Sequence, residues 1–480
     1  MSLMEYNFIL FSTSGSESYK TEFPQRTLGV YRIAHLLREE GYTVKVIDYL
    51  SMLLNDDESR ETLKIYLSIH SKKNTIFGFS SNFFFEFIKR EKSSRKFVIV
   101  EVFEEFLEFL KEEVPACKII LGGWSNASQV IGKNKNIDHW LIGYAESCIQ
   151  NEFKKIYNGE KLDKIIHINS DDWSVRDAKS PFVKEDWILP NETLPIEISR
   201  GCRFKCKFCS YHLLGRKSTD NYIRSPEAVL QELLYNYDNF ATTNYYIMCD
   251  TFNENVDKLK IIKSAFDEFK NITGEQVRFG CYLRLDLLDA FPEQIGLLKD
   301  MGIKSAFFGI ESLHGPSAKS IGKGLSRGRV LKTLQKCKDA WDDASLFGSF
   351  IIGLPEETRE TANEWCQLLY DNKVALTCWQ VRPLYLRQKD HPYITSTSEF
   401  DRNIEKYGYT EYKTNDNEWS LSWKNKHWDF EEALEFSKYW EKKFKENNSI
   451  TTDGNWITAA KLVGYSADEL NQMYKYKFFE

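Results

Sequence analysis

Strand and helix signals alternate along the first third of this 480-residue chain, and each strand ends in small or polar residues. Strands are expected at residues 6–11, 44–47, 75–79 and 118–121, with a helix over residues 27–40 that Gly41 ends. This alternation is typical of a parallel sheet with helices on its faces. It predicts a Rossmann-like, doubly wound α/β domain over residues 1–165, with a ligand at the C-terminal ends of the strands.

A second run of the same alternation follows a linker over residues 166–193. Helical stretches such as 225–237 and 256–271 separate six strand signals, at residues 194–199, 245–250, 278–284, 305–311, 346–353 and 376–381. This repeated strand–helix unit predicts a partial (β/α)6 TIM-like barrel over residues 194–395. Its chemistry is then expected in the loops at the C-terminal ends of the strands.

The last segment, residues 396–480, shifts in composition toward Trp, Tyr, Lys, Asn and Glu. Asp429-Phe-Glu-Glu432 is a capping box before an amphipathic stretch, and Ser466 begins a second helix. We expect a small, aromatic-rich α-helical domain that packs over the barrel mouth. Five of the twelve tryptophans of the chain lie in it, namely Trp419, Trp423, Trp428, Trp440 and Trp456.

The overall composition narrows the class of protein. Hydrophobic residues make up 42% and charged residues 28%, as in ordinary globular proteins, and the length predicts two or three domains. No apolar run reaches the length of a membrane span and no targeting segment opens the chain, so we expect no membrane partner and a cytoplasmic location. The net charge of −6 gives no overall attraction for nucleic acid.

Three of the ten cysteines stand together as Cys202, Cys206 and Cys209, in the spacing Cys-x3-Cys-x2-Cys. They fall in the loop that follows the first predicted barrel strand. Three thiolates hold a four-iron, four-sulfur ([4Fe-4S]) cluster and leave one iron open for a further ligand. The spacing therefore predicts a reactive metal centre at these three residues.

A structural zinc site is the alternative for these thiols, because His212 follows Cys209 by three residues and completes a set of four ligands. Such sites usually pair two ligand clusters, and no second cluster follows here. Of the cysteines on barrel strands, Cys249 and Cys281, one is a candidate hydrogen-atom donor, with core packing as the alternative. Buried packing is expected for the remaining single cysteines, Cys117, Cys148, Cys337, Cys366 and Cys378.

The cysteine spacing, with the aromatic Phe208 before the third cysteine, resembles the signature of the radical S-adenosylmethionine (SAM) enzymes. At the ends of the later strands, polar or flexible residues follow one another in the same order as in that family. Together they resemble the radical SAM core found behind cobalamin-binding domains, which implies a [4Fe-4S] cluster and SAM as cofactors. These strand ends are Asp250-Thr251, Arg284-Leu-Asp286, Gly309-Ile-Glu311-Ser312 with Lys323 downstream, and Gly353 to Thr358.

The resemblance also implies how SAM is held. Phe208 would offer an apolar face to the adenine, and the loop of Asp250 and Thr251 would hold the amino group. Arg284 suits the carboxylate, because a guanidinium binds it at two points. Glu311 suits a ribose hydroxyl or the amino group, and Gly353 lets the backbone approach the adenosine. The implied SAM-binding residues are therefore Phe208, Asp250, Thr251, Arg284, Glu311 and Gly353.

The first domain resembles the cobalamin-binding domain that precedes many radical SAM domains. The likeness rests on residues 24–29 (from Pro24), 41–48, Gly122-Gly123 and 143–146. The Asp-x-His-x-x-Gly loop that supplies a cobalt ligand in many such domains is absent after the first strand. Cobalamin is thus a candidate cofactor. A Rossmann-like domain kept for packing and for roofing the active site is the alternative.

Three functions follow from these patterns. The leading expectation is reductive cleavage of SAM to a 5′-deoxyadenosyl radical, which abstracts hydrogen from a substrate that the sequence does not identify (small molecule, nucleotide or peptide). An electron donor such as flavodoxin or ferredoxin is then the expected partner. The runner-up is cobalamin-dependent radical SAM C-methylation, in which a second SAM recharges the cobalt. The third is a non-catalytic zinc-binding module.

Overall fold

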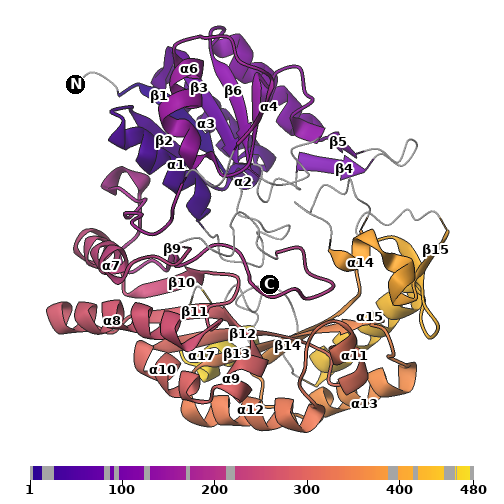
Figure 1. Ribbon diagram of the computed structural model, residues 1–480. Coiled ribbons are helices and arrows are strands. Elements are labelled where there is room, and N and C mark those ends of the chain that lie inside the picture. The colour runs from indigo at the N-terminus through magenta and orange to yellow at the C-terminus, as the bar shows by residue number, and fades with distance from the viewer. Residues whose placement is uncertain are drawn as a thin grey trace.

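The computed structural model describes residues 4–12, 26–80, 87–90, 97–123, 130–168, 173–211, 222–387, 398–413, 420–447, 460 and 462–475. These residues form two six-stranded sheets in which all neighbouring strands are parallel. In Figure 1 the first sheet, in indigo and purple, lies above the second. Within the described ranges, no helix combines the length and the apolar character needed to cross a lipid bilayer.

The first sheet has the spatial order β2 (Val44–Ile47), β1 (Tyr6–Phe11), β3 (Ser71–Ser80), β6 (Lys118–Gly122), β7 (His139–Ile142) and β8 (Ile165–His167). Its larger helices are α1 (Leu28–Glu39), α2 (Leu50–Asn55), α3 (Asp57–His70) and α4 (Glu101–Glu113). Phe8 and Leu10 of β1 share a core with α1, whereas Ile9 and Phe11 share another with α4. Helices thus cover both faces, which confirms the doubly wound α/β prediction.

Several short elements of this domain gave no signal in the sequence. They are the hairpin β4 (Ile88–Arg90) and β5 (Phe97–Ile99), the strands β7 and β8, and the short helices η2 (Ala145–Cys148), η3 (Ile149–Phe153), α6 (Lys154–Tyr157) and η5 (Lys184–Asp186). All are five residues or shorter, so each offers little pattern of its own. Their positions follow from pairing with neighbouring elements.

The second sheet follows chain order, with β9 (Leu194–Glu197), β10 (Asn244–Met248), β11 (Arg278–Leu283), β12 (Ile303–Glu311), β13 (Ser345–Ile352) and β14 (Cys378–Pro383). Helices α7 (Pro226–Phe240), α8 (Val256–Thr273), α9 (Leu285–Ala290), α10 (Glu293–Met301), α11 (Gly315–Ser320), α12 (Arg327–Ala340) and α13 (Arg359–Tyr370) connect the strands. Figure 1 shows α8, α10 and α12 along the lower, outer side. β9 and β14 form the two edges, so the six predicted strands make an open, partial barrel.

The two faces of the second sheet have different neighbours. Tyr245 and Ile247 of β10 share the main core with side chains of α7 and α8. Tyr246, between them, belongs to a second cluster with Phe347 of β13 and Ala460 of the C-terminal segment. Helices therefore cover the outer face, and the last part of the chain reaches the inner face.

The C-terminal segment contains α14 (Glu399–Arg402), η6 (Ile404–Tyr407), the hairpin β15 (Thr410–Lys413) and β16 (Ser422–Lys424), α15 (Phe430–Glu446) and α17 (Ala467–Lys475). The predicted capping box is present, since Asp429 Oδ1 accepts from the Glu432 amide at 2.8 Å and Glu432 Oε2 accepts from the Asp429 amide at 3.1 Å. Trp423, Trp428 and Trp440 are buried in the core. Trp419 and Trp456 lie outside the described residues.

Only part of this segment lies over the barrel mouth. The Phe400 amide donates to the Lys207 carbonyl at 3.0 Å, and the Tyr409 hydroxyl donates to the Gly353 carbonyl at 2.8 Å, both at C-terminal strand ends. The Ala467 amide, by contrast, donates to the Asp343 carbonyl at 3.0 Å, before β13 begins. The last helix therefore lies near the opposite end of the strands, which corrects the expectation that the whole segment covers the mouth.

Candidate functional site

The cysteine loop begins where β9 ends, and backbone contacts fix its path. Gly201 has a φ of +71°, a left-handed turn that glycine adopts without strain. The Cys202 amide donates to the Tyr211 carbonyl at 3.3 Å, and the Cys209 amide donates to the Cys206 carbonyl at 3.1 Å. The Lys207 amide donates to the Ile321 carbonyl at 3.1 Å, beyond β12. The loop is thus closed on itself and attached to the barrel.

Each thiol of the loop has a separate polar neighbour. Cys202 Sγ lies 3.3 Å from Thr251 Oγ1, Cys206 Sγ accepts from Arg284 Nη1 at 3.1 Å, and Cys209 Sγ accepts from the Tyr211 amide at 3.4 Å. Burial raises the pKa of the Cys202 thiol. Burial, together with the two neighbouring thiols, raises the pKa of Cys209 to about 12. Cys202 and Cys209 are therefore held as neutral thiols, and a metal must displace their protons.

The donor set fits an iron–sulfur cluster better than a single ion. Among the described residues, no three His, Cys, Asp or Glu side chains converge on one metal position. Structural zinc requires four ligands at about 2.0–2.3 Å from one atom. The cysteine ligands of a [4Fe-4S] cluster bind different irons, so their sulfurs stay apart. His212, the fourth ligand of the zinc alternative, lies outside the described residues.

Arg284, at the end of β11, lies between the cysteine loop and Asp286. Its Nε and Nη2 donate to Asp286 at 3.0 Å and 2.6 Å, and its guanidinium carbon lies 4.1 Å from the Phe204 ring centroid. Burial works against the charge of Arg284, but the contact with Asp286 raises its pKa overall. The fork expected to hold SAM is therefore bound by a carboxylate of the chain itself.

Glu311 ends β12 in a conformation that is rare for residues other than glycine, with a φ of +69°. A Cβ on Gly309 would lie 2.5 Å from Glu311 Oε1, so a larger residue there would make this carboxyl group move. Burial raises the pKa of Glu311 to about 7, with Lys323 and Arg284 opposing that rise. Lys323 itself donates to the Gly309 carbonyl at 2.8 Å. A strained, buried carboxyl of this kind is a candidate for ligand binding.

Gly353, after β13, has a φ of +87° and both its backbone polar groups engaged. Its amide donates to Glu357 Oε2 at 2.8 Å, and its carbonyl accepts from Tyr409 and, at 3.2 Å, from Asn425 Nδ2. A Cβ here would lie 2.4 Å from Trp423 Cη2. Trp423 of the C-terminal segment is thus the group that approaches Gly353 closely. The predicted contact of Gly353 with adenosine stays a prediction.

The remaining predicted SAM residues lie around the same strand ends. Phe208 is half-buried against the main core, Asp250 is exposed and Thr251 is buried. The Thr251 carbonyl accepts at 3.2 Å from Lys258 Nζ, a buried ammonium group that also lies 3.0 Å from Cys249 Sγ. The structure thus brings the triad together with Thr251 and Arg284, while the roles of the SAM-binding residues stay predictions.

Sequence reasoning missed three residues of this region. Asp286 was noted as polar but not as the partner of Arg284, and Lys258 and Glu357 received no role. Glu357 is fully buried, and burial raises its pKa to about 7 although it accepts from Gly353, Trp365 Nε1 and Ser312 Oγ. The sequence does not show that a lysine or glutamate is buried. Their position shortly after a strand was the feature that could have marked them as site residues.

The C-terminal edge of the first sheet presents small and polar groups. Ser12 Oγ, after β1, donates to Asp48 Oδ1, after β2, and burial raises the pKa of Asp48 to about 6. No atom of the described residues lies within 4 Å of the position of a Cβ on Gly122, at the end of β6. Pro24 lies outside the described residues. These features fit a ligand at this edge that is held without the histidine of many cobalamin domains.

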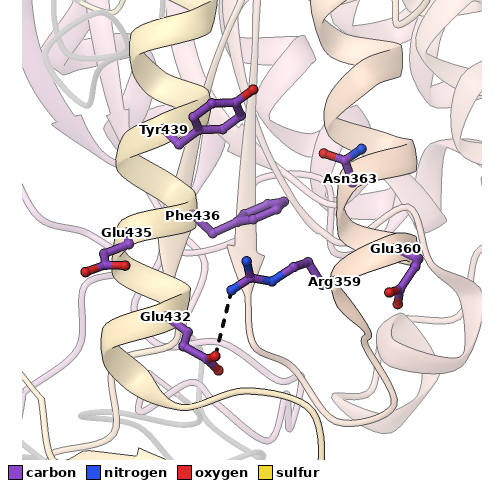
Figure 2. Close-up of a pocket in the computed structure, with 7 residues that line it drawn as sticks. All are labelled: Arg359, Glu360, Asn363, Glu432, Glu435, Phe436 and Tyr439. Carbon is purple, nitrogen blue, oxygen red and sulfur yellow. Dashed lines mark ion pairs between the residues drawn. The ribbon is translucent and has the colours of Figure 1, made fainter.

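A separate pocket of about 520 Å³ lies between α13 and α15 (Figure 2). Arg359 Nη2 and Glu432 Oε1 face each other across its lower part at 3.8 Å. The pocket belongs to two helices rather than to the strand-end loops, so it is distinct from the cysteine site. Its lining residues are Arg359, Glu360, Asn363, Glu432, Glu435, Phe436 and Tyr439.

Comparison with known proteins agrees with this geometry. Residues 196–369 match the model of the radical SAM superfamily. The chain is similar to an uncharacterized methyltransferase of Pyrococcus horikoshii, with 31% identity over 163 residues that cover 34% of this chain and 33% of that protein. It is also similar to an anaerobic magnesium-protoporphyrin IX monomethyl ester cyclase of Cereibacter sphaeroides, with 22% identity over 334 residues that cover 63% of this chain and 53% of that protein.

The matched segments thus span about half or less of these relatives. Among solved structures, the fold is similar to the radical SAM methyltransferase TsrM from Kitasatospora setae with cobalamin and a [4Fe-4S] cluster bound. The TM-score is 0.61 at 13% identity, with 86% of this chain and 81% of that chain covered. This likeness shows the fold, a Rossmann-like first domain before a partial barrel, and the family match assigns residues 196–369 to a radical SAM domain.

Proposed function

We propose that this chain is an enzyme that cleaves SAM reductively at a [4Fe-4S] cluster held by Cys202, Cys206 and Cys209. The observation that carries the proposal is three thiols in one strand-end loop, inside the region that matches the radical SAM family, with Arg284 in contact with Cys206. When bound, the cluster would pass one electron to SAM, whose C5′–S bond would break into methionine and a 5′-deoxyadenosyl radical. That radical would abstract hydrogen from a substrate still to be identified.

The protein's own residues would orient SAM and exclude water. Arg284 now pairs with Asp286 at 2.6 Å. It would release Asp286 and bind the methionine carboxylate of SAM instead. Glu311 would accept a hydrogen bond from a ribose hydroxyl or the amino group in its charged form. Thr251, next to Cys202 and in the loop with Asp250, would support the amino group, and the ring of Phe208 and the turn at Gly353 would flank the adenosine.

Cobalamin-dependent C-methylation is the second candidate function. It is favoured by the first domain, since the fold match that covers 86% of this chain is to a methyltransferase solved with cobalamin. The edge at Ser12, Asp48 and Gly122 would face the corrinoid. In that reaction a second SAM would supply the methyl group that recharges the cobalt. Bound corrinoid therefore distinguishes the two candidates.

We propose flavodoxin or ferredoxin as the electron donor and the cytoplasm as the compartment. All ten cysteines are free thiols in the structure, as expected where glutathione and thioredoxin keep thiols reduced. A low-potential electron carrier of the cytoplasm would then reach the cluster. Reduction of the cluster by purified flavodoxin, followed at the absorbance of the cluster, tests this partner.

The deciding experiment is anaerobic reconstitution with iron and sulfide, followed by incubation with SAM and dithionite. We expect iron in the protein and 5′-deoxyadenosine in the product. Cys206→Ala should abolish both cluster and product. Cys117→Ala, which removes a buried thiol of the first domain, is the matched control and should retain both.

Metal analysis of the same samples separates the alternatives. Cobalt with transfer of a labelled methyl group would establish methylation as the reaction. Zinc without iron, together with intact SAM, would overturn the proposed enzyme in favour of the zinc-binding module. Iron without deoxyadenosine formation would also contradict the proposal.

A further inference from the structure

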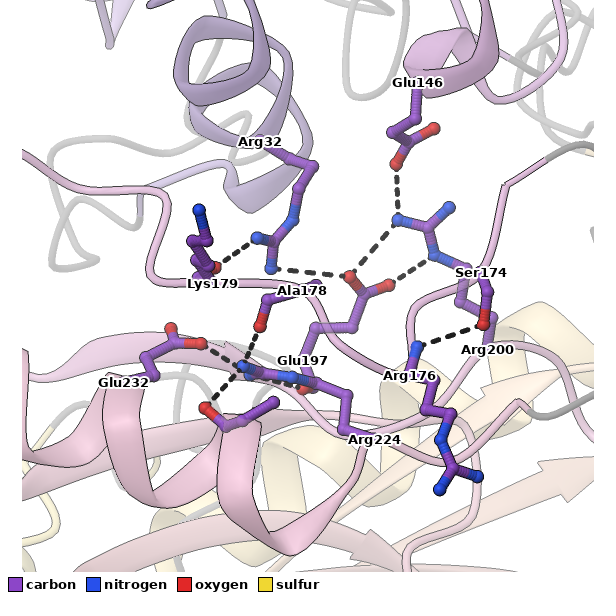
Figure 3. A network of polar contacts seen from close by, with 11 residues as sticks. Arg32, Glu146, Ser174, Arg176, Ala178, Lys179, Glu197, Arg200, Arg224 and Glu232 are labelled. Carbon is purple, nitrogen blue, oxygen red and sulfur yellow. Dashed lines mark hydrogen bonds and ion pairs between the residues drawn. The ribbon is translucent and has the colours of Figure 1, made fainter. Parts of the chain in front are cut away.

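The two domains meet at a buried network of charges directly before the cysteine loop (Figure 3). The most exposed of its six side chains, Arg200, is only 13% exposed. Because three cations face three anions, the network as a whole is neutral, which is the condition for keeping such charges out of water. Its members are Arg32, Arg200 and Arg224, with Glu146, Glu197 and Glu232.

Arg200 is held more tightly than a single ion pair would hold it. Its Nε donates to Glu197 Oε1 at 2.5 Å, and its Nη2 donates to Glu146 Oε1 at 2.5 Å and to Glu197 Oε2 at 3.2 Å. Its guanidinium carbon lies 4.4 Å from the Tyr144 ring centroid and 4.6 Å from that of Trp173. Both the edge and the faces of the guanidinium group are therefore occupied.

The partners of Arg200 belong to different domains. Glu197 is the last residue of β9 in the barrel, whereas Glu146 lies in η2, which follows β7 at the C-terminal edge of the first sheet. Arg32 of α1 adds a second link, with Nη2 3.9 Å from Glu197 Oε2. Cys202 stands only two residues after Arg200. The start of the cysteine loop is thus fixed from both domains.

We propose that Arg200 is a positioning residue that couples residues 143–148 of the first domain to the cysteine loop. Glu146 holds Arg200, and Arg200 holds the backbone that presents Cys202. Because such coupling is reciprocal, an assembled cluster must in turn stabilise the 143–148 segment. The inference rests on the proposed function only in that the cysteine triad binds an iron–sulfur cluster.

Hydrogen exchange with mass spectrometry on the full chain tests this coupling, with and without a cluster reconstituted from iron and sulfide. In the wild-type protein, cluster loading should slow exchange at least tenfold in the peptide over residues 201–211 and also in that over residues 143–150. Glu146→Gln keeps the shape of the side chain but removes its charge. We expect this variant to load iron and to protect the 201–211 peptide, while the 143–150 peptide no longer responds.

Arg176→Gln is the matched control, since Arg176 lies beside the network in Figure 3 but has a side chain that is 53% exposed. It should respond like the wild-type protein in both peptides. An unchanged 143–150 peptide on cluster loading of the wild-type protein would overturn the coupling. So would a Glu146→Gln variant that protects this peptide as fully as the wild-type protein does.

The outcome is separable from that of the proposed function. Deoxyadenosine formation with no response of the 143–150 peptide would sustain SAM cleavage and refute the coupling. A wild-type response that Glu146→Gln abolishes, in a protein that leaves SAM intact, would establish the coupling and refute the proposed reaction.

Discussion

Arg284 and Asp286 form a two-pronged ion pair beside a cysteine of the triad. Nε and Nη2 of the arginine bind the carboxylate at 3.0 Å and 2.6 Å, and Nη1 donates to Cys206 Sγ at 3.1 Å. The nitrogens proposed to receive the carboxylate of SAM thus already hold a carboxylate of the chain. The two carboxylates compete for one fork, so binding of SAM at Arg284 requires Asp286 to leave it.

Removing the charge of Asp286 should therefore strengthen SAM binding. We expect Asp286→Asn to lower the Kd for SAM about fivefold, or about 1 kcal/mol, because the competing anion is lost. Isothermal titration of SAM into the cluster-loaded protein measures this change. Asp289→Asn, also in α9 but paired with Arg329, is the control and should leave the Kd unchanged. Weaker binding in Asp286→Asn would show that Asp286 supports the fork rather than competing for it.

Replacing Arg284 by lysine should weaken SAM binding at least about tenfold, because an ammonium group is a point charge without the two-pronged geometry. Iron content per chain should stay close to that of the wild-type protein, since Arg284 donates to Cys206 but is not a ligand. Parallel measurement of Kd and iron tests this prediction. If iron content fell by as large a factor as the affinity for SAM, Arg284 would be assigned to retention of the cluster instead.

The pKa of Glu311 predicts how SAM binding depends on pH. Burial raises this pKa to about 7, so the carboxyl group is neutral below that pH and charged above it. A carboxylate accepts a hydroxyl hydrogen bond more strongly than the neutral acid does. SAM affinity should therefore rise between about pH 6 and about pH 8, and Glu311→Gln should bind more weakly with a flat profile. A variant with an unchanged profile would exclude Glu311 as the titrating group.

Glu357 predicts a pH dependence of stability. Its folded pKa, about 7, is raised above the ordinary value of 4.5 by burial. A raised carboxyl pKa contributes stability fully below about 4.5, and this contribution is lost as the pH rises through about 7. Urea unfolding at about pH 5.5 and about pH 8 should show a smaller free energy of unfolding at the higher pH.

Glu357→Gln removes this titration and should reduce that difference, while Glu311 and Asp48, whose pKa values are also raised by burial, keep their share of it. The variant should also cost about 1–3 kcal/mol at all pH values, because its amide NH2 group faces either the Gly353 amide or Trp365 Nε1, both donors. Glu356→Gln, at the neighbouring residue, serves as the control and should retain the wild-type slope. A Glu357→Gln variant with the full slope would assign the titration elsewhere.

Gly353→Ala should destabilise the protein by at least about 1 kcal/mol, because alanine resists a φ of +87° and its Cβ would lie 2.4 Å from Trp423. Shortening the tryptophan separates the two causes. In a Trp423→Leu background, Gly353→Ala should lower the free energy of unfolding by less than it does in the wild-type background. An equal loss in both backgrounds would assign the effect to backbone conformation alone.

Both sheets were predictable from the sequence where strands are long enough to show a pattern. All six barrel strands were expected, since each is an apolar run that ends in polar residues, and four of the first sheet's six were found in the same way. The strands β7 and β8, of four and three residues, were missed. The pairing of β7 with β6 and of β8 with β7 is a property of the folded sheet.

The candidate site was predictable as a set of positions but not as a set of contacts. The cysteine spacing and the strand-end residues placed Cys206 and Arg284 in one region. That Asp286 occupies the fork, or that Trp423 covers Gly353 from 70 residues away in the sequence, depends on packing between elements that no local pattern records. The same holds for Arg200, whose partners Glu146 and Glu197 stand 54 and 3 residues away.

The contact of Ala460 with the inner face of the barrel has a consequence for how the protein is made. Ala460 lies against Gly280 of β11, where a Cβ would stand 3.0 Å from its Cα, so residues 180 positions apart meet inside the sheet. During synthesis the strands leave the ribosome well before this segment does, and domains usually fold as the chain emerges. The inner face around Tyr246 and Phe347 therefore lacks Ala460 until more than 100 residues after the end of Phe347's strand have been made. Closure of this part of the barrel is then a late step, which follows the pairing of all six strands.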